Sequence, residues 1–462
     1  MKRSPAAFLS AVLVLGMVLG LAGDAARADS PFYTEQARLI PASLLPLLPP
    51  EKAVGAAVAL SADGSVALVG SLNWPCPGLT TDCGAVYVFV RQGGAWVEES
   101  VLFPDTAGHP SRGQIFSNAL ALSPDGRTAF VSALFEDLVP FEIVGAVYVF
   151  ERTDSGWVQR QKLRPSKPFN ALRFGEKMAL SPDGDLLLVT ALPQFCPPDP
   201  DCGGVYVFAL QNGTWVEETR LPVPAGSPSF FGSALAWAPD QRRVAIGAVG
   251  GFCGNIYRYV RSGTGTWTLL GEVSTSCAVG SSVAISPDGT ELLAGTGNSV
   301  ITFAASGDDW IEQGSFAPTP AVFNADFGHT LALGPGVALV GAPGSICPDL
   351  FINCGSAYVF LKRAGVWTQE QRLTGADPGE FNLIGDFFGT SLALSRSGAV
   401  ALIGAPGEDC DGRGVDGCGG AYLYAAASIA DIPTLSEAAL LLLALGLAGC
   451  GAVLLARRRR LS

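Results

Sequence analysis

The feature that most constrains this sequence is a unit that recurs seven times along the chain. Each copy opens with an aromatic residue or Val followed by Gly or Ser. It continues through an apolar run, a turn, a second apolar run and a loop, and ends in segments of the type V-Y-V-F and W-V-x-E. The opening steps begin at Val54, Phe116, Phe174, Phe231, Val279, Phe327 and Phe388. One such unit cannot bury its apolar face alone, so neighbouring copies must stack around a shared core.

Each unit contains four segments with the character of β-strands. The runs are short, rich in Val, Leu, Tyr and Phe, and bounded by Gly, Pro, Asp and Asn, and no pattern in the body suits a long amphipathic helix. Asp-Gly, which supplies the positive φ of a two-residue hairpin, follows the first run in four copies. These turns begin at Asp63, Asp125, Asp183 and Asp288. The pattern predicts an all-β fold, a seven-bladed β-propeller over residues 29–424.

The last unit lacks its fourth segment, and the N-terminus offers a replacement. Residues 33–39 read YTEQARL and match the sequence after Trp367 closely. We predict that this segment completes the last blade, closing the ring and removing exposed strand edges. The tryptophans that open the fourth segments recur at equivalent places, which predicts packing between blades. They are Trp96, Trp157, Trp215, Trp267, Trp310 and Trp367.

The sixth and seventh units carry the clearest family resemblance. Phe327-Gly328 is followed by Gly341-Ala342-Pro343, and Phe388-Gly389 by Gly404-Ala405-Pro406. These units resemble FG-GAP repeats, which build the propeller of integrin α subunits and of many bacterial surface proteins. The resemblance implies a propeller that binds a ligand or partner on its loop face. Integrin-type calcium loops are not expected between the first two strands, because here those turns hold a single carboxylate.

Residues 1–28 have the organisation of a cleaved secretory signal. Lys2 and Arg3 precede an apolar run, and Ala26-Arg27-Ala28 provides the small residues that a signal peptidase recognises. An uncleaved N-terminal anchor is the alternative. The apolar run is short for a membrane-spanning helix, which favours cleavage and therefore export.

The C-terminal end predicts a membrane anchor. Residues 425–436 form a linker with a sorting motif, and residues 437–462 contain an uncharged apolar stretch followed by Arg457–Arg460. Such a stretch is long enough to cross about 30 Å of hydrocarbon. The arginines should remain cytoplasmic, leaving the propeller outside.

The motif before this span is Ile432, Pro433, Thr434 and Leu435. With the apolar helix and basic tail it resembles the IPTL-type C-terminal sorting signals of Gram-negative bacteria, although Ala438-Ala439 stands where that family usually has Trp-Gly. The resemblance implies cleavage by an exosortase-like protease and transfer to a carrier at the cell surface.

Cysteine usage agrees with an exported protein. Ten of the 11 cysteines lie between the terminal segments. We predict disulfides between close neighbours, as expected in an oxidising compartment, with the last pair assigned by elimination. The pairs are Cys76 with Cys83, Cys196 with Cys202, Cys347 with Cys354, Cys410 with Cys418, and Cys253 with Cys277. Metal binding by these cysteines is less favoured, because the chain has only 2 histidines and the spacings do not suit zinc.

The charge balance restricts the partners. The chain has 29 Lys and Arg against 41 Asp and Glu, a formal net charge of −12. Such a surface would repel phosphate, so no nucleic-acid partner is expected, whereas basic proteins or divalent cations are compatible. Acidity that only maintains solubility is the plainer interpretation.

One loop concentrates carboxylates. Glu408, Asp409, Asp411 and Asp416 lie between the second and third strands of the last unit. Asp409, Asp411 and Asp416 are the candidate calcium ligands, since calcium takes several oxygen ligands. The alternative is an acidic surface loop held by Cys410 and Cys418, and the spacing does not match an EF-hand.

Neither histidine, His109 nor His329, has a nearby nucleophile in a recognised setting. We therefore predict no enzyme but a surface-displayed binding or adhesion module that recognises a protein or glycan through its loops. Trp74, outside the repeat, is the candidate binding residue in those loops. The alternatives are a propeller hydrolase or lyase that acts on polysaccharide through channel carboxylates, and a structural envelope protein.

Overall fold

The computed structural model divides the chain into two units, Glu35–Ala425 and a second made of Met1–Thr34 with Ala426–Ser462. The structure describes residues 32–41, 53–75, 83–104, 115–137, 143–168, 172–192, 204–224, 226–227, 230–250, 254–263, 265–273, 279–322, 325–346, 353–375, 385–408 and 418–427. In the second unit, the Ala427 amide donates a 2.9 Å hydrogen bond to the Phe32 carbonyl.

The described chain forms seven four-stranded sheets, whose neighbouring strands are antiparallel wherever the register is defined. The first three blades comprise β2 (Val54–Leu60), β3 (Val66–Ser71), β4 (Ala85–Gln92) and β5 (Ala95–Leu102); β6 (Phe116–Leu122), β7 (Thr128–Ala133), β8 (Ala146–Thr153) and β9 (Gly156–Leu163); and β10 (Phe174–Leu180), β11 (Leu186–Ala191), β12 (Gly204–Gln211) and β13 (Thr214–Leu221). The fourth and fifth comprise β14 (Phe230–Trp237), β15 (Arg243–Val249), β16 (Asn255–Arg261) and β17 (Trp267–Val273); and β18 (Ser282–Ile285), β19 (Glu291–Gly295), β20 (Val300–Ser306) and β21 (Asp309–Phe316).

The sixth blade comprises β22 (Leu331–Gly334), β23 (Val337–Ala342), β24 (Ser356–Arg363) and β25 (Val366–Leu373). The seventh has three consecutive strands, β26 (Ser391–Leu394), β27 (Val400–Ala405) and β28 (Gly420–Ala426), and its outer strand is β1 (Tyr33–Leu39). The predicted closure of the last blade by the N-terminal strand is therefore confirmed.

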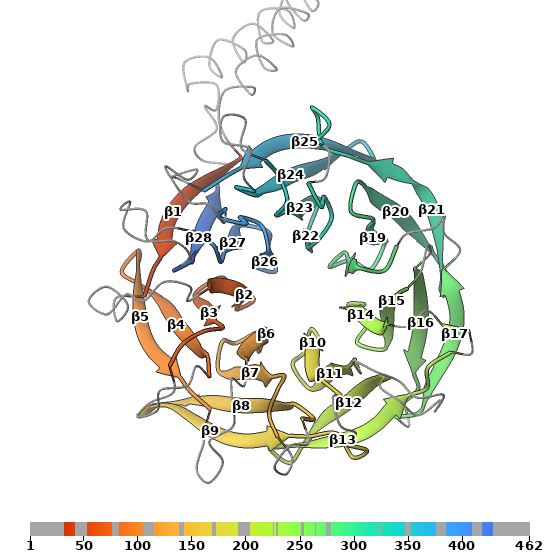
Figure 1. The fold of residues 1–462 in the computed structure, drawn as a ribbon. Helices are drawn as coiled ribbons and strands as arrows, with labels where there is room; N and C mark the ends of the chain where they lie inside the picture. The colour runs from red at the N-terminus through yellow and green to blue at the C-terminus, as the bar shows by residue number, and fades with distance from the viewer. Residues whose placement is uncertain are drawn as a thin grey trace, which may run out of the picture. The chain divides into compact units, whose positions relative to one another are not determined.

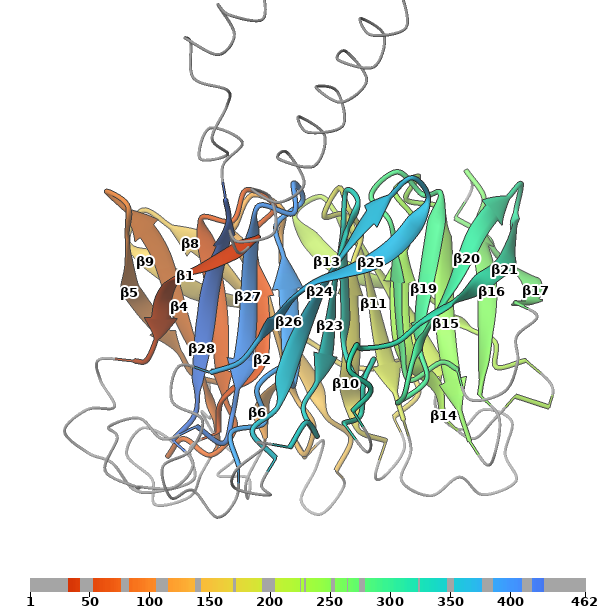
Figure 2. The same ribbon diagram turned by 90° about the horizontal axis from the view of Figure 1, so that it is seen from above.

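The sheets surround a common centre (Figure 1), which confirms the seven-bladed propeller. The first strand of each blade lies nearest the centre, and the fourth lies at the outside, where β1 takes its place beside β5 and β25. In the view turned by 90° (Figure 2) the strands run between two rims of the ring.

The second residue of each opening step must adopt a left-handed backbone. Gly55 has φ 89°, and a Cβ there would lie 2.1 Å from the Gly420 carbonyl oxygen of the neighbouring blade. Glycine is required because only hydrogen fits at this approach. Ser117 holds the equivalent place in the second blade with φ 82°, and it is fully buried.

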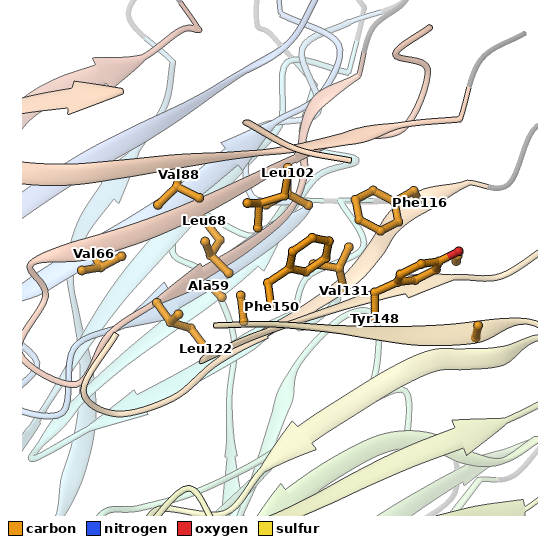
Figure 3. Close-up of a cluster of buried hydrophobic side chains, with 14 of the residues drawn as sticks. Ala59, Val66, Leu68, Val88, Leu102, Phe116, Leu122, Val131, Tyr148 and Phe150 are labelled. Carbon is orange, nitrogen blue, oxygen red and sulfur yellow. The ribbon is translucent and has the colours of Figure 1, made fainter. Parts of the chain in front are cut away.

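The core lies between adjacent blades. One buried cluster joins the first and second blades, with Val66, Leu68 and Val88 facing Phe116, Val131 and other residues of the next sheet (Figure 3). The Phe116 ring meets the Tyr148 ring edge-on at 5.5 Å. In the five blades that open with Phe, this ring packs edge-on against the Tyr of the third strand of the same blade.

The tryptophans of the fourth strands also contact neighbouring blades. Trp215 of the third blade packs edge-on against Phe130 of the second at 4.9 Å. The Trp157 indole donates to Glu99 of the preceding blade at 3.0 Å, and Trp267 donates to Glu218 at 3.1 Å. Packing between blades accounts for the recurrence of these residues.

Several predicted segments fall beyond the described residues. They are the signal peptide at 1–28, most of the 425–436 linker with Ile432–Leu435, and the anchor at 437–462. Within the described ranges no helix has the length and apolar character needed to cross a membrane.

Candidate functional site

Antiparallel pairing gives the ring two different rims. The turns from first to second strand and from third to fourth strand lie at one rim, which we call the turn rim. The loops from second to third strand, and the connections to the next blade, lie at the other, which we call the loop rim.

The turn rim repeats one local arrangement. The Ser61 hydroxyl donates to Asp63 Oδ1 at 2.6 Å and accepts from the Val66 amide at 2.9 Å. The hydrogen bond from Ser61 is the main reason that the pKa of Asp63 lies below its ordinary value. Three more turns use the same Ser–Asp pair, namely Ser123 with Asp125, Ser181 with Asp183, and Ser286 with Asp288. These carboxylates are engaged within their own turns.

A cavity of about 440 Å³ opens at the turn rim where the first strands meet. Its walls come from six blades and are formed mainly by Leu, Ile, Trp and Pro side chains. Arg396 is the one charged residue among the described lining residues. Polar and apolar surface are nevertheless exposed to this mouth in about equal amounts.

The loop rim is organised differently. In four blades the loop after the second strand is closed at its base by backbone hydrogen bonds to one carbonyl. Trp74 accepts from the Cys83 and Gly84 amides at 2.8 and 2.9 Å, and Glu408 accepts from Gly419 at 2.9 Å. Glu136 and Ser345 do the same in the second and sixth blades. This position holds Trp in the first blade, Glu in the second and seventh blades, and Ser in the sixth. In all four blades its carbonyl accepts the hydrogen bonds that close the loop, and we call this shared arrangement the backbone frame.

Glu136 forms a buried ionic cluster at this position. Its side chain is 4% exposed, and Oε1 lies 2.7 Å from both Lys162 Nζ and Arg164. The Tyr148 hydroxyl donates to the other oxygen, Oε2. A buried carboxylate requires such partners because transfer from water is costly. The repeat pattern alone does not single out Glu136, although Glu408 occupies the matching place in its repeat.

Glu408 is also buried and paired. Arg38 of β1 lies 2.6 Å from Oε1, and the Tyr422 hydroxyl donates to the same oxygen. Arg38 additionally lies 5.7 Å from the centre of the Tyr422 ring. Glu408 thus fixes the N-terminal strand to the last blade and faces the interior of that blade. The calcium candidates Asp409, Asp411 and Asp416 lie outside the described residues, and within the described ranges no group of three or more metal-ligating side chains occurs.

Trp74 lies at the base of its loop. Its ring meets Tyr87 edge-on at 6.1 Å and packs partly buried against the core between the last and first blades. The rest of that loop, 76–82, is outside the described ranges. The role of Trp74 in binding stays a prediction.

Three predicted half-cystines are described. Cys83, Cys354 and Cys418 are buried and disulfide-bonded. Their assigned partners and the remaining predicted cysteines lie outside the described residues: Cys76, Cys196, Cys202, Cys253, Cys277, Cys347 and Cys410. The pairing stays a prediction.

His329 is held near the start of the sixth blade. Its Nδ1 lies 2.7 Å from Asp326 Oδ2, and both side chains are about half exposed. This hydrogen bond lowers the pKa of Asp326. His109 is not among the described residues.

One segment of the chain matches the sequence model of a known repeat family. Residues 367–424, which span β25 to the third strand of the last blade, match the FG-GAP repeat. This match supports the propeller architecture, and a search of curated protein sequences finds no significant match.

Several solved structures resemble the chain. A protein from Lactobacillus plantarum is 16% identical with a TM-score of 0.47, and the match covers 69% of this chain and 84% of that one. A periplasmic gluconolactonase from Pseudomonas aeruginosa is 18% identical with a TM-score of 0.48, covering 69% and 85%. A functionally unknown protein from Desulfotomaculum acetoxidans is 14% identical with a TM-score of 0.44, covering 69% and 88%.

Proposed function

We propose that this chain is an exported binding module, held at the cell envelope, that recognises a protein or glycan through the loops of the loop rim. The observation that carries the proposal is the contrast in chemistry at one repeat position. Trp74, Glu136, Ser345 and Glu408 occupy the same backbone frame, so three different residue types, Trp, Glu and Ser, close the loops at this position. A rigid scaffold with varied loops is the usual arrangement of a recognition surface.

The described lining of the channel mouth, which holds Arg396 and no carboxylate, supports the same proposal. A catalytic channel of the kind considered as the alternative needs carboxylates that converge on a sugar. The described walls of the 440 Å³ cavity are instead formed mainly by apolar residues and proline. Polysaccharide hydrolysis or cleavage remains the alternative prediction.

Export and anchoring rest on the terminal sequences. The basic-apolar-small pattern of residues 1–28 directs the chain to the secretory pathway, and the apolar stretch before Arg457 holds it in the membrane. The IPTL-like motif at 432–435 would direct an exosortase-like protease to this end.

A binding screen tests the proposal. Purified residues 29–430 are applied to glycan and envelope-protein arrays, once with calcium and once with chelator. We expect a specific partner, and loss of its binding in chelator would assign a metal role to Asp409, Asp411 and Asp416. A matched variant replaces residues 77–82 with Gly and Ser while keeping both flanking cysteines.

The control variant replaces Gly93 and Gly94, an exposed turn with open space around it at the opposite rim. We expect the loop replacement to weaken capture and the turn replacement to leave it unchanged. Equal capture by variants in every loop of the loop rim would exclude that rim as the binding surface.

A further inference from the structure

The cavity at the turn rim has the size and lining of a small-molecule site. Its volume of about 440 Å³ lies within the roughly 300–1,000 Å³ typical of ligand pockets. Six side chains supply most of its apolar wall, each from the end of a first strand: Leu60, Leu122, Leu180, Trp237, Ile285 and Leu394. Four prolines continue this wall toward the solvent. The concave lining therefore comes from six separate blades, and apolar and polar surface contribute to it about equally.

One cation lies across this cavity. Arg396 belongs to the turn of the seventh blade, and its guanidinium donates to the Pro182 carbonyl of the third blade at 2.6 Å. The blades that contain β26 and β10 lie on opposite sides of the ring (Figure 1). The hydrogen bond between them therefore takes the Arg396 side chain across the mouth. Within the described residues Arg396 has this neutral carbonyl as its side-chain partner and no carboxylate. A guanidinium has five N–H donors, and a planar carboxylate matches two of them better than one carbonyl does.

The surrounding groups are already fixed. The Arg396 amide donates to the Ala62 carbonyl at 2.9 Å, and the Ala62 amide donates to Pro124 at 3.0 Å, which links three neighbouring turns. The Trp237 indole donates to the Ala179 carbonyl of the preceding blade at 3.0 Å. Because the polar edge of Trp237 is satisfied there, its contribution to the cavity is apolar. A ligand would meet a preformed wall and reorient mainly one side chain, which limits the entropic cost of binding.

The hydroxyl groups near the cavity are also engaged. Ser181 and Ser286 donate to Asp183 and Asp288 in their own turns. Arg396 supplies the only positive charge of the described lining. A single positive charge suits a ligand with one negative charge better than a phosphate dianion.

We infer that the turn-rim mouth of the channel binds a small organic acid with one carboxylate on an apolar body. The carboxylate replaces the Pro182 carbonyl on Arg396, and the apolar body occupies the wall formed by Leu122, Leu180 and Trp237. This site is at the opposite rim from the loops of the proposed function and does not depend on it.

Calorimetry on the purified exported protein tests this inference with four probes: acetate, benzoate, naphthoate and neutral naphthamide. We expect affinity to rise from acetate to naphthoate as the apolar body grows. Naphthamide should bind at least about tenfold more weakly than naphthoate, because it lacks the charge-assisted hydrogen bond. Arg396→Gln should weaken naphthoate by a similar factor and leave naphthamide nearly unchanged.

Arg242→Gln is the matched control, since Arg242 is an exposed arginine at the same rim outside the cavity lining. It should leave naphthoate affinity unchanged. Leu180→Trp, which fills the cavity, should abolish naphthoate binding while Arg396 is retained. The inference is overturned if no carboxylate binds at millimolar concentration, if naphthamide equals naphthoate, or if Arg242→Gln weakens binding as much as Arg396→Gln.

Discussion

The two rims of the ring differ in how far equivalent residues are repeated from blade to blade. At the turn rim the same Ser–Asp pair recurs in four blades, and each pair satisfies its own turn within five residues. At the loop rim the equivalent position after the second strand changes from Trp74 to Glu136, Ser345 and Glu408, while its backbone hydrogen bonds persist. Repetition is thus strongest in the turns, whereas the loop rim varies at a position with constant backbone hydrogen bonds, which supports the proposed role of its loops in recognition.

The largest loss of stability is expected from a change in the opening step of a blade, because this step recurs in every blade and supports the whole ring. Gly55→Ala would place a Cβ 2.1 Å from the Gly420 carbonyl oxygen, a backbone atom that cannot move aside cheaply. We expect a loss of about 3 kcal/mol or more in the free energy of unfolding, measured by denaturant titration.

Gly213→Ala is its control. Gly213 also has positive φ, 77°, but a Cβ there would meet nothing within 4 Å. Its cost should be about 1 kcal/mol, from the left-handed backbone alone. Equal losses in the two variants would show that the close approach between blades is unimportant.

The next effect concerns the loop rim. Glu136→Gln leaves Lys162 and Arg164 without their buried counter-charge, and we expect a loss of about 2 kcal/mol, because both cations are partly exposed. Glu151→Gln, which removes an exposed ion pair with Arg160 in the same blade, should change stability by less than about 0.5 kcal/mol. Thermal unfolding compares the two. Similar small losses would mean that Glu136 contributes no more than a surface pair.

At the turn rim a smaller effect is expected from Ser61→Ala, about 1 kcal/mol at pH 7, since the buried hydroxyl joins Asp63 to the Val66 amide. The folded-state pKa of Asp63 is depressed, so its contribution is present above the ordinary value of about 3.9 and is lost as pH falls through the folded pKa. The difference between wild type and variant should therefore shrink in acid.

Melting temperatures at neutral pH and near pH 3 measure this difference. Ser155→Ala, whose hydroxyl lies 3.0 Å from the Thr153 hydroxyl in an exposed turn, is the control and should show little pH dependence. A Ser61→Ala penalty that grows in acid would contradict the proposed role of Asp63.

The smallest effect is a stabilisation. Ser117 holds φ 82° where the other blades have glycine, and its buried hydroxyl has no hydrogen-bond partner among the described residues. Ser117→Gly should stabilise the protein by about 0.5 kcal/mol, because relief of strain exceeds the entropy that glycine loses on folding. A raised melting temperature would support this, whereas a lowered one would show that the serine makes a favourable contact.

The sequence predicted the architecture well because strand periodicity and turn chemistry are local. Residues 33–39 were predicted to close the ring and form β1 with those bounds, and all six repeat tryptophans lie in fourth strands. Even the fourth and fifth units, which lack Gly-Ala-Pro, form complete four-stranded sheets. Their apolar runs are therefore sufficient for strand pairing.

The site chemistry was less accessible from sequence. Arg396 meets Pro182 across 214 positions of the chain, and Glu136 meets Lys162 and Arg164 through pairing of β8 with β9. A repeat pattern assigns each residue to a strand, but it does not give the direction of a long side chain across a closed ring. Glu408 is an example: its position in the sequence groups it with the acidic loop, but in the structure its side chain is paired with Arg38.

The most direct test of the division between the rims is hydrogen–deuterium exchange of the protein with and without the partner captured in the array screen. We expect new protection in peptides at the loop bases, such as residues 72–75, 134–137 and 344–346. The turn-rim peptides around Ser61 and Ser286 should exchange as before. Protection confined to the turn rim would exclude the loop rim as the recognition surface and assign recognition to the turn rim.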